Sequence, residues 1–177
     1  MFVAQKLRQQ NVVAYALYMF QVEDVIRAFG LDADRIRSEY LPRFGYDAEQ
    51  TTAAAEWYGH LARMMREEGV SEKGHVQVVR NTLILLADRH QELLQDPKQP
   101  FYAAAYYKAL PTIVELRARG ADKEKGEIEN CLDAVYGLTV LKMQGREPSA
   151  ETKAAMQPVS HLLELLSKGF AAAPEET

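Results

Sequence analysis

The feature that most limits the fold of this chain is the regular alternation of helix-length segments with residues that begin or end helices. Gly30, Gly69 and Gly145 each follow a segment with helical spacing of apolar residues, and glycine is favoured just beyond a helix. Asp47 and Ser149 precede such segments and are good N-cap residues. Strand-like alternation nowhere extends beyond a few residues. The pattern predicts an all-α, single-domain fold, mainly an up-and-down bundle of about six long helices plus one short helix.

The same helix-starting and helix-ending residues predict where each helix lies. The expected helices cover residues 4–29, 33–41, 48–68, 72–96, 101–119, 123–144 and 150–169. Asp32 should cap the second helix, which should end before Pro42, and Ser71 should start the fourth. Pro111 should kink the fifth helix, and Pro158 should bend or interrupt the seventh, because proline lacks a backbone N–H. Residues 1–170 then form a single helical domain, and 171–177 a frayed tail.

The composition is that of a soluble globular protein, with 47% hydrophobic and 26% charged residues. The net charge is −4, and Lys and Arg are spread along the chain, so we expect no nucleic-acid partner. The apolar run 12–20 is shorter than the roughly 20 residues needed to span a bilayer, so we expect no membrane partner. The single cysteine, Cys131, cannot form an internal disulfide, which favours a cytoplasmic location.

The first expected helix carries three charged residues in an otherwise apolar setting: Glu23, Asp24 and Arg27. Their spacing predicts pairs within the helix, from Glu23 to Arg27 and from Asp24 to Arg27. The same helix has a second apolar patch opposite its main apolar stripe, and a helix that is apolar on two sides must be covered on both. We therefore expect a packing surface against the rest of the bundle or a second chain. The interface candidates are Val13, Leu17, Phe20, Asp24 and Arg27.

The fifth expected helix, residues 101–119, is the most apolar, with its polar side chains on one narrow strip. Such a helix should lie in the middle of the bundle, where buried tyrosines need partners for their hydroxyl groups. The bend at Pro111 should free the carbonyl of Tyr107 from its helical hydrogen bond. An aromatic core is the simpler interpretation, and a ligand pocket along this helix is the alternative. The pocket candidates are Tyr102, Tyr106, Tyr107, His75 and His90.

Sequence motifs for catalysis or metal binding are weak. Glu72 and His75 form one E-x-x-H pair, whereas di-iron bundles use two such pairs together with further carboxylates. His75 and His90 would lie roughly 22 Å apart along one helix and could not share an ion. There is no G-x-S-x-G motif and no glycine-rich phosphate loop. Cys131 falls on an apolar stripe and should be a buried, unreactive thiol. We therefore predict no metal, no cofactor and no catalytic residue.

Five stretches spread over nearly the whole chain carry a resemblance to known proteins. They are FVAQKLR, YMFQVEDVIRAFGLD, WYGHLARMMREEGVSEKGH, FYAAAYYKALPTIVELRARG and the segment around EIENCLDAVYG. In order and spacing they resemble a family of uncharacterised bacterial helical proteins from the Bacteroidetes, carried as a domain of unknown function. The resemblance implies a soluble bacterial helical domain and brings no activity, cofactor or catalytic residue to this chain.

Two hypotheses for function follow from these patterns. The first is a noncatalytic cytoplasmic helical domain that acts through protein–protein contacts, as a homodimer or with another protein, because the first helix has two apolar faces. The second is a small-molecule-binding protein or enzyme with a pocket along the bent helix 101–119. The sequence identifies neither a ligand nor a partner.

Overall fold

In a computed structural model, which describes residues 1–120 and 124–171, all regular structure is helical, and the predicted all-α class is confirmed. The α-helices are α1 Phe2–Gln10, α2 Val12–Ala28, α3 Ala33–Arg35, α4 Ala48–Glu67, α5 Gln77–Gln95, α6 Pro100–Arg119, α7 Glu127–Met143 and α8 Ala150–Ala171. None of the helices in these two segments is both long and apolar enough to cross a membrane.

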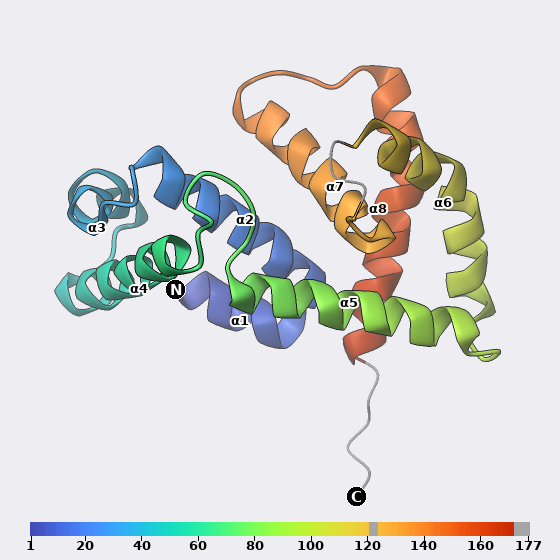
Figure 1. The fold of residues 1–177 in the computed structure, drawn as a ribbon, viewed down its shortest axis with the longest axis horizontal. Coiled ribbons are helices and arrows are strands. Elements are labelled where there is room, and N and C mark those ends of the chain that lie inside the picture. Colours follow the sequence, from blue (N-terminus) through green and yellow to red (C-terminus); the bar gives the residue numbers. More distant parts are fainter. Residues whose placement is uncertain (121–123, 172–177) are drawn as a thin grey trace, which may run out of the picture.

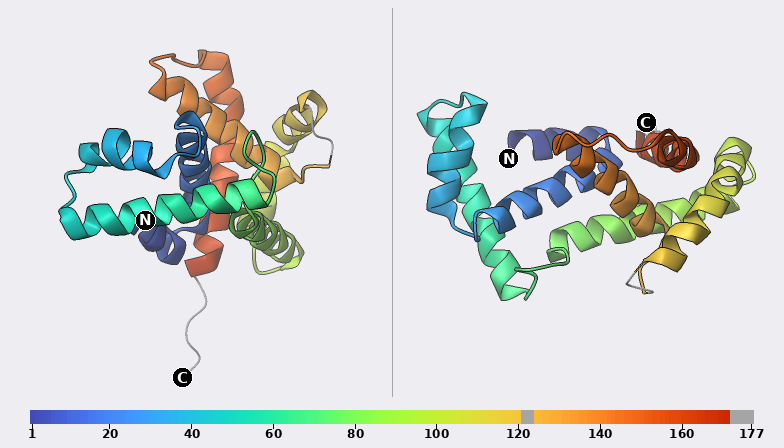
Figure 2. Two further views of the ribbon diagram at one scale, coloured as in Figure 1. Left: turned by 60° about the vertical axis from the view of Figure 1, so that its left-hand side comes forward. Right: turned by 90° about the horizontal axis from the view of Figure 1, so that it is seen from above.

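Helix α5 connects the two halves of the bundle (Figure 1). It contacts α2 on one side and α6, α7 and α8 on the other, while α1 and α4 contact α2. Helices α6 and α8 share the most extensive contact in the described residues, and Figure 2 shows both helices from two further sides. The buried apolar side chains form one connected core. Its largest fully buried apolar members are Met19, Ile26, Ile36, Leu41, Met65, Leu86, Ile113, Leu132, Leu162 and Leu166.

The predicted helix boundaries at Asp47 and Ser149 are confirmed. The carboxylate of Asp47 accepts the backbone N–H of Gln50 at 2.8 Å, and the Gln50 side chain accepts the N–H of Asp47, which completes a capping box. The hydroxyl of Ser149 accepts the N–H of Thr152 at 3.1 Å. Both caps could be predicted because each hydrogen bond joins residues that are only three positions apart in the sequence.

The prediction of one helix over residues 4–29 is wrong, because the chain breaks at Asn11. This residue has an extended backbone, with φ −157° and ψ 97°, and separates α1 from α2. Its side chain accepts the N–H of Ala14 at 2.9 Å and caps α2. Asparagine competes with helical hydrogen bonds in this way, so the break allows α1 to fold back against α2.

The fourth predicted helix begins later than expected, at Gln77 instead of directly after Ser71. The cause is a cap that comes from distant parts of the chain. The buried carboxylate of Glu23 accepts the N–H of Val76 at 2.8 Å, and that of Glu68 accepts the N–H of Gln77 at 2.6 Å. Two carboxylates thus lie at the N-terminus of α5, where the helix dipole favours negative charge.

Two other boundaries differ from the prediction. The second expected helix does not end before Pro42, because α3 passes into a π-helical turn, Ile36–Tyr40, and then into a 3-10 turn, Leu41–Phe44. Proline is tolerated there, at the start of the 3-10 turn. Helix α7 begins at Glu127. The predicted start at Lys123 lies outside the described residues. The predicted tail 171–177 does so too, except for Ala171, which is the last residue of α8.

Helix α6 does not lie in the middle of the bundle, contrary to the prediction from its apolar composition. It lies at the edge of the molecule and bends midway in Figure 1, with Pro111 inside it. Only one face is covered by neighbouring helices; its buried residues are Tyr102, Ala105, Ala109 and Ile113. Phe101, Tyr107 and Val114 are 83%, 68% and 58% exposed. The apolar residues that suggested a central position therefore include a second face that is open to solvent.

Replacing Asn11 with Ala should lower the free energy of unfolding by about 1 kcal/mol, because the N-cap hydrogen bond to Ala14 is lost. Urea denaturation followed by circular dichroism measures this loss. Asn11→Asp is the matched control, since its carboxylate can accept the same N–H and should retain most of the stability. Equal stability of the Ala and Asp variants would show that the break does not depend on this cap.

Candidate functional site

The charged residues of α2 form a hydrogen-bonded polar site, but not by the predicted pairing. Glu23 is completely buried, and its Oε2 lies 2.6 Å from Nδ1 of His75, while Oε1 accepts the N–H of Val76. The expected pair between Glu23 and Arg27 is therefore wrong. A buried carboxylate needs such partners, because an unpaired charge in the interior is costly.

His75 is fixed on several sides. Its ring stacks on Phe20 with 4.2 Å between the ring centroids, and its Nδ1 faces Glu23. No residue in the described segments hydrogen-bonds its other ring nitrogen, Nε2, and the side chain keeps 15% of its surface exposed. The ring edge that carries Nε2 is thus the edge that faces solvent. In a neutral imidazole, an Nδ1 that donates to Glu23 leaves Nε2 as a hydrogen-bond acceptor.

Arg27 and Asp24 tie α2 to two other segments. Nη1 of Arg27 lies 3.0 Å from Oδ1 of Asp24, which is the predicted i,i+3 pair. Nη2 of Arg27 donates to the carbonyls of Val70 and Gly74 in the loop before α5. The hydroxyl of Tyr136, on α7, donates to Oδ2 of Asp24 at 2.8 Å. The three charged residues therefore anchor a loop and a helix of the same chain.

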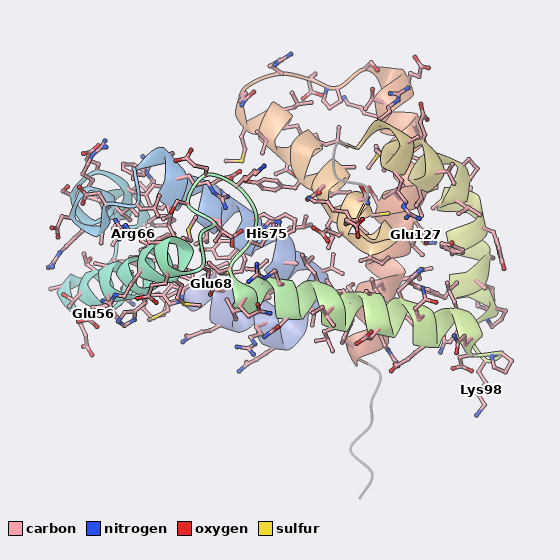
Figure 3. All side chains as sticks on the ribbon, in the orientation of Figure 1. Glu56, Arg66, Glu68, His75, Lys98 and Glu127 are labelled. Atoms are coloured by element: carbon pink, nitrogen blue, oxygen red, sulfur yellow. The ribbon has the colours of Figure 1, made fainter. Side chains whose placement is uncertain are left out.

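The anchored loop forms one wall of a cavity of about 400 Å³, together with α5 and the start of α7. Figure 3 shows His75 and Glu68 beside this loop, and Glu127 at the start of α7. The apolar side chains that line the cavity are Val70, Leu83, Ile84, Ala87 and Ile128. The titratable side chains that line it are His75, Arg80, Lys125 and Glu129. We call this cavity the His75 groove.

The cations of the His75 groove are held by carboxylates. Nη2 of Arg80 lies 3.3 Å from Glu68. Nζ of Lys125 lies 2.6 Å from Asp133 and 3.5 Å from Glu129. Burial lowers the pKa of Lys125, but the hydrogen bond and charge of Asp133, with Glu129, outweigh it and raise the pKa overall. Lys125 is therefore charged at neutral pH.

A second polar cluster lies where α5, α6 and α7 meet. Nδ1 of the buried His90 is 2.7 Å from the hydroxyl of Tyr102, and the hydroxyl of Tyr106 donates to Oε2 of Glu127 at 3.0 Å. Nε2 of His90 is 3.9 Å from the same Glu127 oxygen, too far for a hydrogen bond. Burial lowers the pKa of His90 more than the charge of Glu127 raises it, so the imidazole is neutral at pH 7.

The five pocket candidates therefore do not share one site. Tyr102, Tyr106 and His90 belong to the second polar cluster. His75 lines the separate His75 groove, and Tyr107 is 68% exposed. A cavity of about 370 Å³ does border α6, but its lining comes from α6 and α8 and includes none of the three tyrosines. Glu127, which joins the cluster through Tyr106, was missed by the sequence analysis because its partners are brought near only by the fold.

The interface candidates on α2 lie mostly under the chain's own helices. Val13 and Phe20 are 7% and 2% exposed, and Leu17 is half-buried against the core. Asp24 is exposed, and Arg27 is partly exposed. Helices α2, α7 and α8 contact one another here, so α7 and α8 cover the second apolar patch of α2. The side chains of Val13 and Phe20 are thus buried within the chain itself.

Glu72 and His75 lie in the loop before α5, so the E-x-x-H pair is not on a helix as predicted. Across residues 1–120 and 124–171, no three His, Cys, Asp or Glu side chains are placed to hold one metal ion. Cys131 is fully buried, and burial raises the pKa of its thiol to about 12. A thiol in that setting is a weak nucleophile, as the sequence predicted.

The outer face of α6 carries a feature that the sequence analysis placed inside the bundle. Apolar residues recur there at intervals of three and four, and all are exposed to solvent. They are Phe101, Ala104, Tyr107, Pro111 and Val114, and we call them the α6 stripe. Lys108 and Glu115 are exposed along one edge of this stripe. The signal in the sequence was a helix that is apolar all round, which must be covered on both sides.

A family model described as a domain of unknown function (DUF4924) matches residues 1–177. No curated protein and no solved structure matches the chain. The matched residues therefore include the site around Glu23 and His75, the second polar cluster and the α6 stripe. The family description gives no activity for any of them.

Glu23→Ala should lower the free energy of unfolding by about 3 kcal/mol, because it leaves His75 and the N–H of Val76 without their buried partner. In a double-mutant cycle with His75→Ala, the coupling energy should be about 1–3 kcal/mol. Glu39→Ala is the control: within the described part of the chain this exposed glutamate pairs only with Arg35, and its loss should cost less than about 1 kcal/mol. Additive effects at Glu23 and His75 would contradict the described contact.

His90 should make the protein less stable in mild acid. Because burial lowers its folded-state pKa below the ordinary 6.5, the unfolded chain binds the proton first as pH falls. Stability present above pH 6.5 should therefore be lost below it, by up to about 1.4 kcal/mol per pH unit. Urea unfolding at a series of pH values measures this slope. His90→Gln should flatten it, while the exposed-site control His60→Gln should not; an unchanged slope in His90→Gln would refute the assignment.

Proposed function

The chain belongs to the DUF4924 family of domains of unknown function. We propose that it is a noncatalytic helical domain that acts through protein–protein contacts. Its partner in this proposal is a second copy of the same chain, which packs on the α6 stripe. The observation that carries the proposal is the stripe itself, with Phe101, Tyr107 and Val114 at 83%, 68% and 58% exposed. A continuous apolar surface of this kind is typical of an interaction site.

The spacing of the α6 stripe fits another helix. From Ala104 to Val114 its residues are separated by three, four and three positions, which is the repeat that forms the seam between two packed helices. The opposite face of α6 already packs on the core through Ala105, Ala109 and other residues. A partner helix on the stripe would cover the second apolar face that α6 leaves open to solvent.

The charges beside the stripe favour an antiparallel pair of α6 helices. Lys108 and Glu115 each follow a seam residue by one position, so both lie on the same edge. A two-fold axis near Pro111 would place Lys108 opposite Glu115 of the partner subunit, and the reverse pair would form by symmetry. A parallel pair would instead place Lys108 beside Ala103 and Glu115 beside Leu110 of the partner subunit, where neither charge is satisfied. Charge complementarity therefore supports self-association.

A bacterial origin in the Bacteroidetes and a cytoplasmic location belong to the same proposal. The support for the location is the single buried cysteine, Cys131, which has no disulfide partner in the chain. The support for the origin is the sequence resemblance of the five stretches quoted above. The net charge of −4 favours a protein partner over a nucleic acid.

Light scattering after size exclusion should give the wild-type chain a mass near twice its 20.0 kDa. Tyr107→Glu with Val114→Glu should produce a monomer, because two charges would enter the apolar seam, with a loss of affinity of about a hundredfold or more. Met143→Glu is the control, since Met143 is 63% exposed on α7 and lies outside the stripe. A strictly monomeric wild-type protein at high concentration would contradict the proposal.

Exchanging the charges of Lys108 and Glu115 tests the orientation of the two paired helices, independently of the test for dimer formation. Lys108→Glu or Glu115→Lys alone should weaken the dimer, because each places like charges opposite one another across the seam. The double variant should recover the wild-type dissociation constant, as measured by sedimentation equilibrium. Failure of the double variant to recover would reject the antiparallel arrangement.

A further inference from the structure

Another cavity, of about 330 Å³, lies beneath α1 and forms because the helix breaks at Asn11. The chain changes direction at this residue, so α1 packs back against α2 and encloses a space between α1, α2, α4 and α5 (Figure 1). We call this cavity the α1 pocket. Its lining includes Arg8, Tyr15, Trp57 and His60.

Tyr15 supplies the α1 pocket with a polar group that the rest of the chain does not use. This residue is only 6% exposed, yet its hydroxyl forms no hydrogen bond with the described residues. Among residues 1–120 and 124–171, the side-chain atoms that are both fully buried and unpaired are Nε of Arg27 and Nε2 of His90. The Tyr15 hydroxyl is therefore not sealed inside the core. A tyrosine buried to this extent normally has a hydrogen-bond partner, and a ligand in the pocket would supply one.

Arg8 brings a positive charge that no carboxylate holds. It is exposed on α1 and forms a salt bridge with none of the described acidic side chains. Burial raises the pKa of Tyr15, and the charge of Arg8 acts in the opposite direction, so the guanidinium lies near this hydroxyl. Glu23 raises the pKa of Tyr15 further, but its two oxygens are already used by His75 and Val76. The Tyr15 hydroxyl is thus protonated at neutral pH and, like Arg8, is a hydrogen-bond donor.

The lining that the described residues give the α1 pocket contains no acidic side chain. The indole N–H of Trp57, which can only donate, also lacks a hydrogen-bond partner among these residues. This setting differs from that of the His75 groove, where carboxylates pair with Arg80 and Lys125. Unused donors beside an unpaired cation favour a ligand with a negatively charged oxygen.

The rest of the α1 pocket is apolar and suits a flat ring. Met19, Leu61, Met64 and Val78 line it together with the ring of Trp57. Aromatic rings pack well against other rings and against the sulfur of methionine. A cavity of about 330 Å³ has the size of a small-molecule site, in which apolar walls combine with a few polar groups.

We propose that the α1 pocket binds a small aromatic carboxylate, its carboxylate held by Arg8 and the Tyr15 hydroxyl and its ring packed against Trp57. Such a ligand gives the buried hydroxyl a partner and the free guanidinium a counter-charge. The proposal does not depend on self-association, because no residue of α6 lines the pocket.

Fluorescence titration of the full chain with phenylacetate tests the proposal. Trp57 is the single tryptophan of the sequence, so its emission reports on the α1 pocket directly. The emission should change in a saturable way, with a Kd below about 1 mM. Phenylacetamide, which has the same ring but no charge, should bind at least about tenfold more weakly.

Two variants test the groups that hold the carboxylate. Arg8→Gln should weaken phenylacetate binding by about tenfold, because it removes the charge. Tyr15→Phe should weaken binding by about fivefold and should not lower the melting temperature, because the deleted hydroxyl has no partner in the chain. Lost stability with unchanged binding in Tyr15→Phe would overturn the assigned role of this hydroxyl.

Lys6→Gln is the matched control, because Lys6 is exposed on the same helix as Arg8 but does not line the pocket. This variant should bind phenylacetate as the wild type does. Unchanged Trp57 emission, or a wild-type Kd weaker than about 1 mM, would overturn the proposal. Equal binding of phenylacetamide, or full binding by Arg8→Gln, would overturn it as well. The dimer mass is measured independently, so either proposal can fail alone.

Discussion

The fold depends on one buried carboxylate. Glu23 lies on α2 but serves residues more than fifty positions away, where it accepts the N–H of Val76 and meets His75. A fully buried carboxylate is tolerated only where hydrogen bonds replace those of water, so this contact fixes the relative position of α2 and the start of α5. Arg27, one turn farther along the same helix, holds the preceding loop, and Asp24 holds α7 through Tyr136. Hydrogen bonds of these three charged residues thus connect α2 to the loop before α5 and to α7.

The positions of the His75 groove and the α6 stripe follow from how the helices are placed around these contacts of α2. The loop fixed by Glu23 and Arg27 leaves the His75 groove between itself, α5 and α7. Helix α6 packs on α7 and α8 with one face only, which leaves the α6 stripe open. The groove is lined by apolar side chains and by cations that are paired with carboxylates, whereas the stripe has the length and spacing of a helix partner.

Local signals allowed much of the fold to be predicted. The caps at Asp47 and Ser149, the helix ends at Gly69 and Gly145, and the pair of Asp24 with Arg27 all involve residues within four positions of one another. The helix break at Asn11 also depends on a nearby residue, since the Asn11 side chain caps α2 at Ala14. It was missed because the apolar pattern continues on both sides of Asn11. N-cap preference at that residue could have revealed it.

The remaining features depend on distant residues, which the sequence does not bring together. The start of α5 is set by carboxylates from α2 and from the end of α4. Within the second polar cluster, Tyr106 meets Glu127 only because α6 and α7 pack together. The edge position of α6 could not be predicted from its apolar composition, because a helix covered by its own bundle and one covered by a partner have the same pattern.

The central claim is that the α6 stripe pairs with a second copy of itself in antiparallel orientation, and disulfide trapping tests it most directly. The native Cys131 is buried, so a cysteine introduced at an exposed position is the reactive thiol. Under mild oxidation, Pro111→Cys should form a covalent dimer, because residue 111 lies beside the two-fold axis. Ala104→Cys should not, because its two copies would lie roughly 20 Å apart, far beyond disulfide reach. Trapping at both positions, or at Ala104→Cys alone, would contradict the account.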